Sequence, residues 1–304
     1  MEKVERIVDQ ISRVVFGKTP QIRLALACFL ARGHLLIEDL PGIGKTTMAK
    51  VLAKSMGLNF ARMQFTSDLL PGDILGTSVF ERDSSMFTFH PGPIFTQIFL
   101  ADEINRATPK TQSALLEAME EGQISMDGET RPLEPPFFVI ATQNPLEQSG
   151  TFPLPESQMD RFLMRINIGY PDRDAEAQIL RGESSHGILE GLEPCVDRNE
   201  VLQIQETVAS LHVSDTFIQY LQDLMEFSRN SGVFQTGLSP RSGMALAAAA
   251  KGWAFLDGRD YVIPEDLQHI LPWVVGHRLR SGRDHSPIPL DGIMGYFSKV
   301  PVPV

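Results

Sequence analysis

The amino-acid sequence predicts an α/β domain with a parallel five-stranded sheet, followed by a smaller all-α domain. Three features predict this fold: short apolar runs, helical segments between those runs, and a helical pattern after about residue 171. Alternation of strands and helices favours right-handed crossovers and a parallel sheet. The chain of 304 residues is long enough for two modest domains, which we place at 1–181 and 182–304.

Five segments are predicted as strands. Residues 34–37, 98–101 and 137–141 are apolar without alternation, which is typical of strands covered by helices on both faces of their sheet. Residues 59–65 and 164–170 complete the sheet. In the last segment apolar and polar residues alternate, which predicts a position at the sheet edge.

Helices are predicted between the strands and through the second domain. Residues 46–56 precede Gly57, a residue type that commonly ends a helix. Thr108 can cap a helix that begins at Pro109 and ends at Gly122. Further helices are expected at 172–181, 200–211, 214–228, 240–256 and 264–279, with a polar connector at 182–194.

Two insertions interrupt the alternation of strands and helices. Residues 123–133 are predicted to form a β-hairpin, because Asp127-Gly128 is a favoured two-residue turn. Residues 65–95 form a longer insertion that contains two segments rich in proline and glycine.

Composition narrows the classes of function. The net charge of -11 and the pI of about 5.1 disfavour a general nucleic-acid binder, because an acidic surface repels phosphate. The two cysteines, Cys28 and Cys195, are interpreted as reduced thiols. The first residues lack the apolar core of a signal peptide, and no apolar stretch approaches the ~20 residues of a membrane span. We therefore expect a cytoplasmic protein.

A glycine-rich loop between a predicted strand and a predicted helix indicates a phosphate-binding P-loop. Its glycines let backbone N–H groups approach phosphate, while Lys45 can reach the β and γ phosphates and Thr46 can bind Mg²⁺. The usual first glycine is replaced by Asp39. The residues expected to contact ATP here are Asp39, Leu40, Pro41, Gly42, Ile43, Gly44, Lys45, Thr46 and Thr47.

Polar residues also follow the ends of two other predicted strands. Asp102 is expected to hold Mg²⁺ and Glu103 to polarise the attacking water. Asn144 follows the third apolar strand and is expected to reach the same crevice. Together with the P-loop these residues predict an ATPase site.

These motifs, taken in order, resemble those of the MoxR family of AAA+ ATPases over nearly the whole chain. The segments that carry the resemblance are 102–107, 141–145, 158–162, 238–241, 256–266 and 277–279. The resemblance implies a P-loop NTPase core of the AAA+ type with a smaller helical lid domain.

The resemblance also implies roles for residues outside the P-loop. Asn144 would be sensor 1, and Arg161 would be an arginine finger that enters the neighbouring subunit's ATP site. Arg241 would be sensor 2, contacting ATP in its own subunit, and Arg106 would pair across the subunit interface. Guanidinium groups offset the charge that spreads over the γ-phosphate oxygens. Residues 14–18 would line the adenine pocket, with Val15, Phe16 and Gly17 in contact.

A protein-remodelling motor is the function that the resemblance favours. It implies a ring, expected to be a hexamer, with partners that carry a von Willebrand factor A domain and with both insertions at the ring pore. A nucleic-acid motor is an alternative, but residues 125–131 of the expected hairpin are acidic with one arginine. A motor subunit of a metal chelatase is a third possibility, since it shares the architecture.

Overall fold

The computed structural model describes residues 2–145, 150–181 and 185–303, and its five-stranded sheet is entirely parallel, as predicted. The strand order is β2-β5-β8-β1-β9, so the last strand lies at the predicted edge. The strands are β1 (Leu35–Glu38), β2 (Phe60–Gln64), β5 (Ile98–Asp102), β8 (Phe138–Gln143) and β9 (Met164–Ile166). The last is shorter than the predicted 164–170.

Each face of the sheet buries its own apolar cluster, because successive side chains of a strand point to opposite faces. In β1, Leu35 and Ile37 pack into one cluster and Leu36 into the other. Every residue of β5 and β8 is buried. This burial on both faces explains why the central strands are apolar without alternation.

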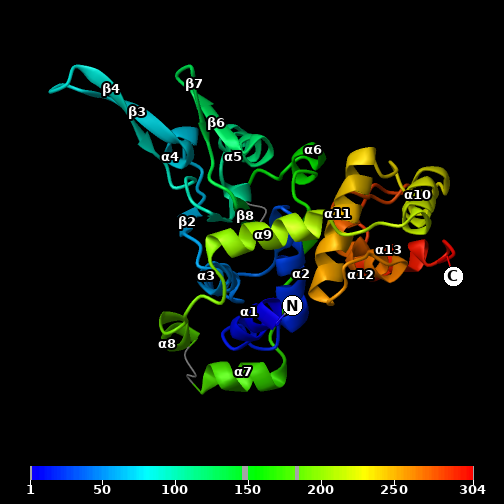
Figure 1. Ribbon diagram of the computed structural model, residues 1–304. Helices are drawn as coiled ribbons and strands as arrows, with labels where there is room; N and C mark the ends of the chain where they lie inside the picture. Colours follow the sequence, from blue (N-terminus) through cyan, green and yellow to red (C-terminus); the bar gives the residue numbers. More distant parts are fainter. Residues whose placement is uncertain (1, 146–149, 182–184, 304) are drawn as a thin grey trace.

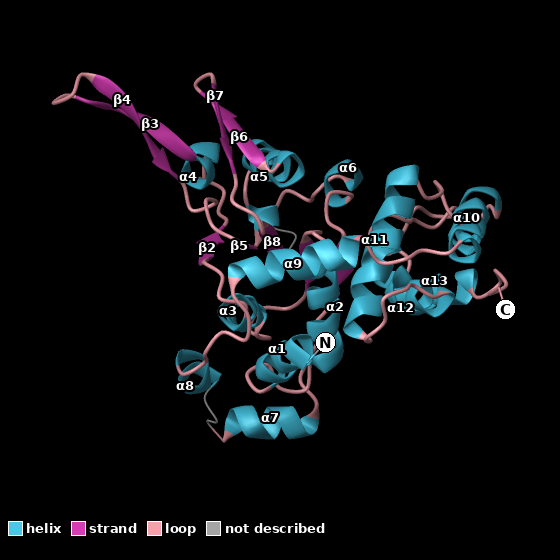
Figure 2. Cartoon of the chain, viewed as in Figure 1, coloured by secondary structure: helices cyan, strands magenta, loops and turns pink. Residues whose placement is uncertain are grey.

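Helices cover both faces of the sheet (Figures 1 and 2). The predicted helix after the P-loop begins one residue earlier, at Lys45, and the one capped by Thr108 begins at Pro109 as expected. The helices and turns of this domain are α1 (Glu2–Ser12), α2 (Thr19–Leu30), α3 (Lys45–Ser55), α4 (Pro71–Leu75), η1 (Ile104–Arg106), α5 (Pro109–Glu121), α6 (Glu156–Met159) and α7 (Arg173–Leu180).

Two β-hairpins project from the same end of the domain (Figures 1 and 2). The predicted hairpin is formed by β6 (Gln123–Met126) and β7 (Glu129–Pro132), with Asp127 and Gly128 at positive φ in its turn. The longer insertion contains a second hairpin, β3 (Gly76–Glu81) with β4 (Met86–Pro91). The Ser78 hydroxyl donates to the Asp127 carboxylate, which joins the two hairpins.

The second domain is all-α, as predicted, but the helix expected at 264–279 ends at Val275. Two of its helices were not predicted. The expected polar connector contains a short helix, α8, and an additional helix, α13, follows the predicted ones. The predicted boundary between residues 181 and 182 adjoins 182–184, which lie outside the described residues. The helices are α8 (Ser185–Glu190), α9 (Arg198–Ala209), α10 (Asp215–Asn230), α11 (Pro240–Leu256), α12 (Pro264–Val275) and α13 (Leu290–Phe297).

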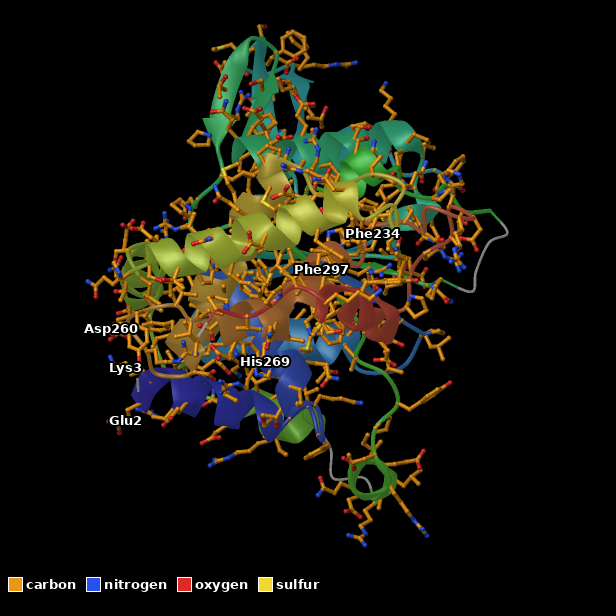
Figure 3. All side chains as sticks on the ribbon, turned by 90° about the vertical axis from the view of Figure 1, so that its right-hand side faces the viewer. Glu2, Lys3, Phe234, Asp260, His269 and Phe297 are labelled. Atoms are coloured by element: carbon orange, nitrogen blue, oxygen red, sulfur yellow. The ribbon has the colours of Figure 1, made fainter. Side chains whose placement is uncertain are left out.

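Close helix packing fixes the second domain against the first. A Cβ atom on Gly252 of α11 would lie 2.4 Å from the carbonyl oxygen of Ala27 in α2, so only glycine permits this approach. An ion pair between Lys3 and Glu200 ties α1 to α9, and Figure 3 shows Lys3 at the chain's amino-terminal end. Phe234 stacks on Phe297 in the interior of the second domain (Figure 3).

No helix in the described ranges is both long enough and apolar enough to cross a membrane.

Candidate active site

The glycine-rich loop leaves the carboxyl end of β1 and turns directly into α3. Gly42 and Gly44 adopt φ of +82° and +92°, a conformation that favours glycine. The Lys45 ammonium donates to the carbonyl oxygens of Asp39 and Leu40 at 2.8 and 2.9 Å. Desolvation lowers the pKa of Lys45, while the nearby carboxylates of the site raise it. The loop therefore holds a lysine at a site surrounded by negative charge.

Asp39 occupies the position of the usual first glycine and stabilises the start of the loop. Its side chain is buried, and its two oxygens accept from the backbone N–H groups of Leu40 at 2.8 Å and Gly169 at 2.6 Å. The carboxylate thus fastens the start of the loop to the segment after β9. A glycine could not form these hydrogen bonds.

Asp102 and Glu103 lie at the carboxyl end of β5, beside β8. The Thr142 hydroxyl donates to Asp102 Oδ1 at 2.6 Å and accepts from the Glu103 backbone N–H at 2.9 Å. Glu103 has a φ of +56°, which is uncommon for a residue with a side chain, and such strain is concentrated at functional sites. Thr142 therefore orients both acidic residues.

Basic and amide side chains approach these two carboxylates from β2 and η1. Arg62 contacts Asp102 Oδ2 through Nη2 at 2.7 Å and Nε at 3.1 Å. Gln64 donates to Glu103 Oε2 at 2.7 Å, and Arg106 pairs with the same oxygen at 2.7 Å. The expected pairing of Arg106 across a subunit interface stays a prediction, because its described ion pair is within the chain.

Two neighbouring cavities meet at the P-loop. One of about 380 Å³ is lined by P-loop residues together with Arg62, Gln64 and both acidic residues. The other, of about 480 Å³, is lined mainly by apolar residues, including those of the expected adenine pocket. Both cavities are bordered by Pro41, Gly42, Gly44 and Thr47.

The expected adenine-pocket segment lines the second cavity through Val14, Val15, Phe16 and Lys18. Lys18 donates to the carbonyl oxygen of Tyr170 at 2.6 Å, which closes one side. Gly17 has a φ of +68°, and a Cβ there would lie 2.9 Å from the Asp172 carboxylate. Glycine therefore permits the turn that places its neighbours in the cavity.

Asn144 leaves the sheet between the other two site strands. It directly follows β8, which pairs with β5 on one side and β1 on the other. The three strand ends that the sequence assigns to one crevice are thus adjacent.

The two predicted arginines lie together, but near the amino ends of the strands, away from the P-loop. Arg161 Nη1 is 2.6 Å from the Glu120 carboxylate, and Arg241 Nη1 is 3.0 Å from the same carboxylate. Arg241 Nε also lies 3.6 Å from Asp160. Neither arginine lines the two cavities at the P-loop.

Strand direction explains this separation. The segment that carries Arg161 precedes β9, and Leu163 donates to the His34 carbonyl at 2.8 Å, just before β1. His34 Nε2 contacts the Met119 carbonyl at 3.1 Å and brings the end of α5 to the same end of the strands. The P-loop follows the other end of β1, so Arg241 lies away from it here, and the expected contact of Arg241 with ATP in its own subunit stays a prediction.

Sequence reasoning missed Arg62, Gln64 and Thr142. Arg62 and Gln64 are two residues apart and therefore share one face of β2, and this polar pair in a predicted strand could have indicated a site. Its meaning depends on β2 lying beside β5, which only the strand order reveals. Thr142 was recognisable as a hydroxyl at the end of a buried apolar strand.

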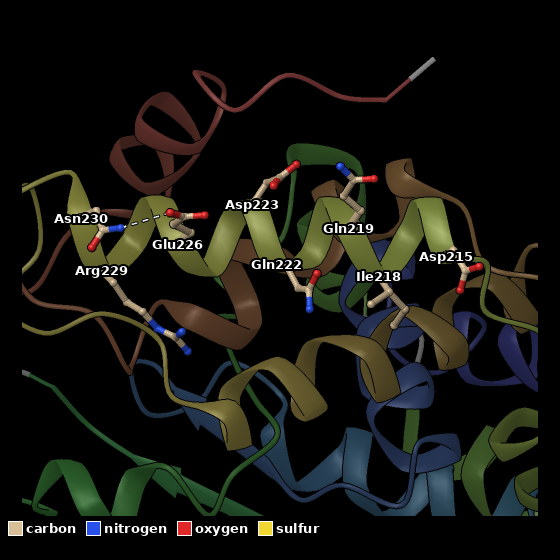
Figure 4. A pocket seen from close by; sticks show the side chains of 8 residues that line it. All are labelled: Asp215, Ile218, Gln219, Gln222, Asp223, Glu226, Arg229 and Asn230. Atoms are coloured by element: carbon tan, nitrogen blue, oxygen red, sulfur yellow. Dashed lines mark hydrogen bonds between the residues drawn. The ribbon is translucent and has the colours of Figure 1, made fainter.

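A further hollow of about 770 Å³ runs along the outer face of α10 (Figure 4). Its lining comes from that one helix and is mostly polar, including Asp215 and Glu226. None of the predicted site residues lies there, so the P-loop crevice is the candidate active site.

The P-loop residues fit a magnesium-bound nucleotide. Gly42 and Gly44 open toward space in which a Cβ would meet no atom within 4 Å. The start of α3 offers backbone N–H groups and the positive end of its dipole. Thr46 and Asp102 line this cavity and could supply oxygen ligands of the kind that Mg²⁺ prefers.

Comparisons with known proteins match this chain to AAA ATPases. The model of the "ATPase family associated with various cellular activities (AAA)" matches residues 34–164, and an AAA lid domain model matches 226–291. The chain is 46% identical to the uncharacterized protein YeaC of Bacillus subtilis, over 90% of this chain and 86% of that protein. It is 37% identical to Chaperone MoxR1 of Mycobacterium tuberculosis, over 91% of this chain and 75% of that protein.

A solved structure agrees as well. The crystal structure of a protein assigned as an ATPase from Cytophaga hutchinsonii matches with a TM-score of 0.90 and 36% identity. The match covers 99% of this chain and 94% of that one. The chain therefore belongs to the MoxR family of AAA+ ATPases.

Proposed function

We propose that this chain hydrolyses ATP as one subunit of a hexameric ring and uses the energy to remodel partner proteins. The observation that carries the proposal is that the charged groups are divided between the two ends of the parallel strands. Lys45, Asp102 and Glu103 lie near the carboxyl ends, and Arg161 and Arg241 lie near the amino ends. A site divided in this way is completed when one end of one copy meets the other end of the next.

In this proposal the chemistry begins with residues of one subunit. Backbone N–H groups of the P-loop and Lys45 bind the β and γ phosphates. Thr46 and Asp102 would hold Mg²⁺, which would offset the charge of the phosphate oxygens. Glu103 accepts a proton from the attacking water as the water oxygen bonds to the γ phosphorus and the bond from that phosphorus to the ADP oxygen breaks, which releases ADP and phosphate. Asn144 orients the water or the γ-phosphate.

The neighbouring subunit contributes the two arginines. Arg161 and Arg241 share the Glu120 carboxylate, so they are already held as a pair with side chains 28% and 48% exposed. Both would exchange Glu120 for the γ-phosphate of the next copy, where a guanidinium offsets charge in the transition state. Arg241 thus acts between subunits in this proposal.

The β3–β4 hairpin supplies a surface for partner proteins. Its exposed apolar side chains are Val79, Phe80, Met86 and Phe87. In the adjacent hairpin, Arg131 pairs with Glu129 and lies 3.9 Å from the ring of Phe89. An apolar hairpin whose neighbouring arginine is engaged internally suits a polypeptide better than a phosphate backbone.

The likeness to a chaperone supports a role on proteins. We propose that the partners include proteins with a von Willebrand factor A domain and the client proteins of the ring. The two hairpins would then face the ring pore.

A pull-down with Glu103→Gln tests the partner proposal, since an ATP-bound variant that does not hydrolyse should retain its partner. We expect capture with Mg-ATP of a protein that contains a von Willebrand factor A domain. The same variant with Phe80→Ser and Phe87→Ser should lose it, whereas Ile218→Ser on the outer face of α10 (Figure 4) should keep it. Light scattering must show a six-subunit mass with ATP; a monomer would contradict the ring.

A further inference from the structure

A series of partly buried polar contacts joins the base of the P-loop to the second domain. Glu38, the last residue of β1, accepts from Gln143 Nε2 at 2.7 Å and pairs with Arg165 Nη1 at 2.9 Å. Arg165 Nη2 donates to the carbonyl oxygen of Gly276 at 3.0 Å. One guanidinium thus bridges the end of β1 and the end of α12.

The bridge is confined and has little freedom to adjust. The side chains of Glu38 and Arg165 are 21% and 14% exposed. A Cβ on Gly276 would lie 2.6 Å from the Pro272 carbonyl and 3.4 Å from Arg165 Nη2, so the guanidinium sits against bare backbone. Because the donors of arginine form a rigid planar fork, one partner cannot move far while both hydrogen bonds remain.

The contacts continue from α12 to the segment that carries the arginine pair. His277 Nε2 lies 3.1 Å from the Phe162 carbonyl, which can only accept, so this nitrogen is the donor. Arg278, whose side chain is 6% exposed, donates to Asp160 Oδ1 at 2.6 Å and to the Phe162 carbonyl at 2.8 Å. The end of α12 therefore holds residues 160–162 in place.

The last links reach the two arginines. Asp160 Oδ2 is 3.6 Å from Arg241, and Arg241 shares Glu120 with Arg161. The other end of this series of contacts adjoins the candidate ATP site, because Glu38 precedes Asp39 and Gln143 precedes Asn144. Continuous contacts thus connect the two ends of the sheet between which the site is divided.

We propose that Glu38, Arg165 and Arg278 are positioning residues that couple ATP occupancy at the P-loop to the placement of Arg161 and Arg241. This inference rests on the proposed function, because the arginines are taken to serve the next subunit. A shift of the β1 and β8 ends on ATP binding displaces Glu38. Arg165 carries the displacement to α12, and Arg278 carries it to residues 160–162.

Substitution of these arginines by lysine distinguishes a role in coupling the two ends of the sheet from a role in stabilising the fold. Lysine keeps the positive charge and can bind Glu38 or the Gly276 carbonyl, but it cannot bridge both as the arginine fork does. Arg165→Lys should therefore fold and bind ATP, yet lose the response at the far end of the sheet. The matched control is Arg32→Lys, whose arginine pairs with Glu206 on the surface at 2.7 Å.

Hydrogen–deuterium exchange of the full chain with Mg²⁺ and a non-hydrolysable ATP analogue provides the test. Protection of α3 reports nucleotide binding, and protection of 159–166 and 272–279 reports the far end of the sheet. In the unmodified chain and in Arg32→Lys, the analogue should slow exchange in all three segments. In Arg165→Lys and Arg278→Lys, α3 should keep its response while the far segments lose at least two thirds of theirs.

Two results would overturn the coupling by different routes. If α3 is protected and the far segments respond equally in Arg165→Lys and the unmodified chain, the relay is wrong and the proposed ATPase stands. If the analogue protects α3 in none of these proteins, the chain does not bind ATP, and the relay fails together with the proposed function.

Discussion

Arg62 and Asp102 form an ion pair across β2 and β5, with Arg62 Nη2 2.7 Å from Asp102 Oδ2. The carboxylate is the one proposed to hold Mg²⁺, and its other oxygen accepts from Thr142. Arg62 and the metal ion would therefore share one carboxylate.

Replacing Arg62 should make the site easier to load with metal. Because the side chain of Arg62 is 45% exposed, the ion pair is partly screened and its loss is a modest effect. Arg62→Gln should lower the Mg²⁺ concentration for half-maximal ATP binding about two- to fivefold, which corresponds to roughly 0.4–1 kcal/mol. Titration of Mg²⁺ with a fluorescent ATP analogue measures it. An unchanged or higher requirement would show that the two cations do not compete.

Lys45 is expected to provide much of the affinity for nucleotide. Lys45→Ala should raise the ATP Kd about 10- to 100-fold, since a hydrogen bond to a charged group contributes about 1.5–3 kcal/mol. Isothermal titration calorimetry gives the Kd directly. Lys54→Ala is the control, because Lys54 lies on the same helix but donates to the Glu190 carbonyl. Equal affinities for the Lys45→Ala and Lys54→Ala variants would remove the phosphate role.

The arginine pair can be tested by mixing inactive variants. Arg161→Ala and Arg241→Ala should each hydrolyse ATP poorly, and so should Glu103→Gln. Mixed rings of Glu103→Gln with either arginine variant contain interfaces that join an intact Glu103 to an intact arginine pair, so activity should return. Steady-state ATPase assays across mixing ratios measure this. Absence of recovery with Arg241→Ala alone would return that residue to its own subunit's site.

The P-loop and Arg241 show what the sequence can and cannot predict here. The P-loop, Asp102 and Asn144 were located because each directly follows a recognisable strand, and parallel strands end at a common edge. The position of Arg241 was not predictable in this way. It depends on how α11 packs against α2, which is set by contacts such as that of Gly252 with Ala27, far apart in the sequence.

Two buried histidines should make the fold sensitive to mild acid. Desolvation lowers the pKa of His34 to about 4 and lowers that of His277 well below its usual value. Below about pH 6.5 the unfolded chain therefore binds more protons than the folded chain. The free energy of unfolding decreases as the pH decreases, by up to about 1.4 kcal/mol per pH unit and per histidine.

Urea denaturation between pH 7.5 and 5.5 measures this dependence. His34→Gln should be less stable overall but should show a shallower loss toward pH 5.5. His285→Gln should match the unmodified chain, because His285 is exposed. If the free energy of unfolding depends on pH in the same way with and without His34, then His34 does not contribute to the acid sensitivity.

The central claim is that Lys45, Asp102 and Glu103 form one ATP-hydrolysing site, and Glu103→Gln tests it most directly. Binding and turnover of Mg-ATP should be measured on the same preparation, by calorimetry and phosphate release. We predict that the ATP Kd stays within about threefold while kcat falls roughly 100- to 10,000-fold, the usual contribution of a general base. Full turnover by Glu103→Gln, or an unmodified chain that binds no ATP, would contradict it.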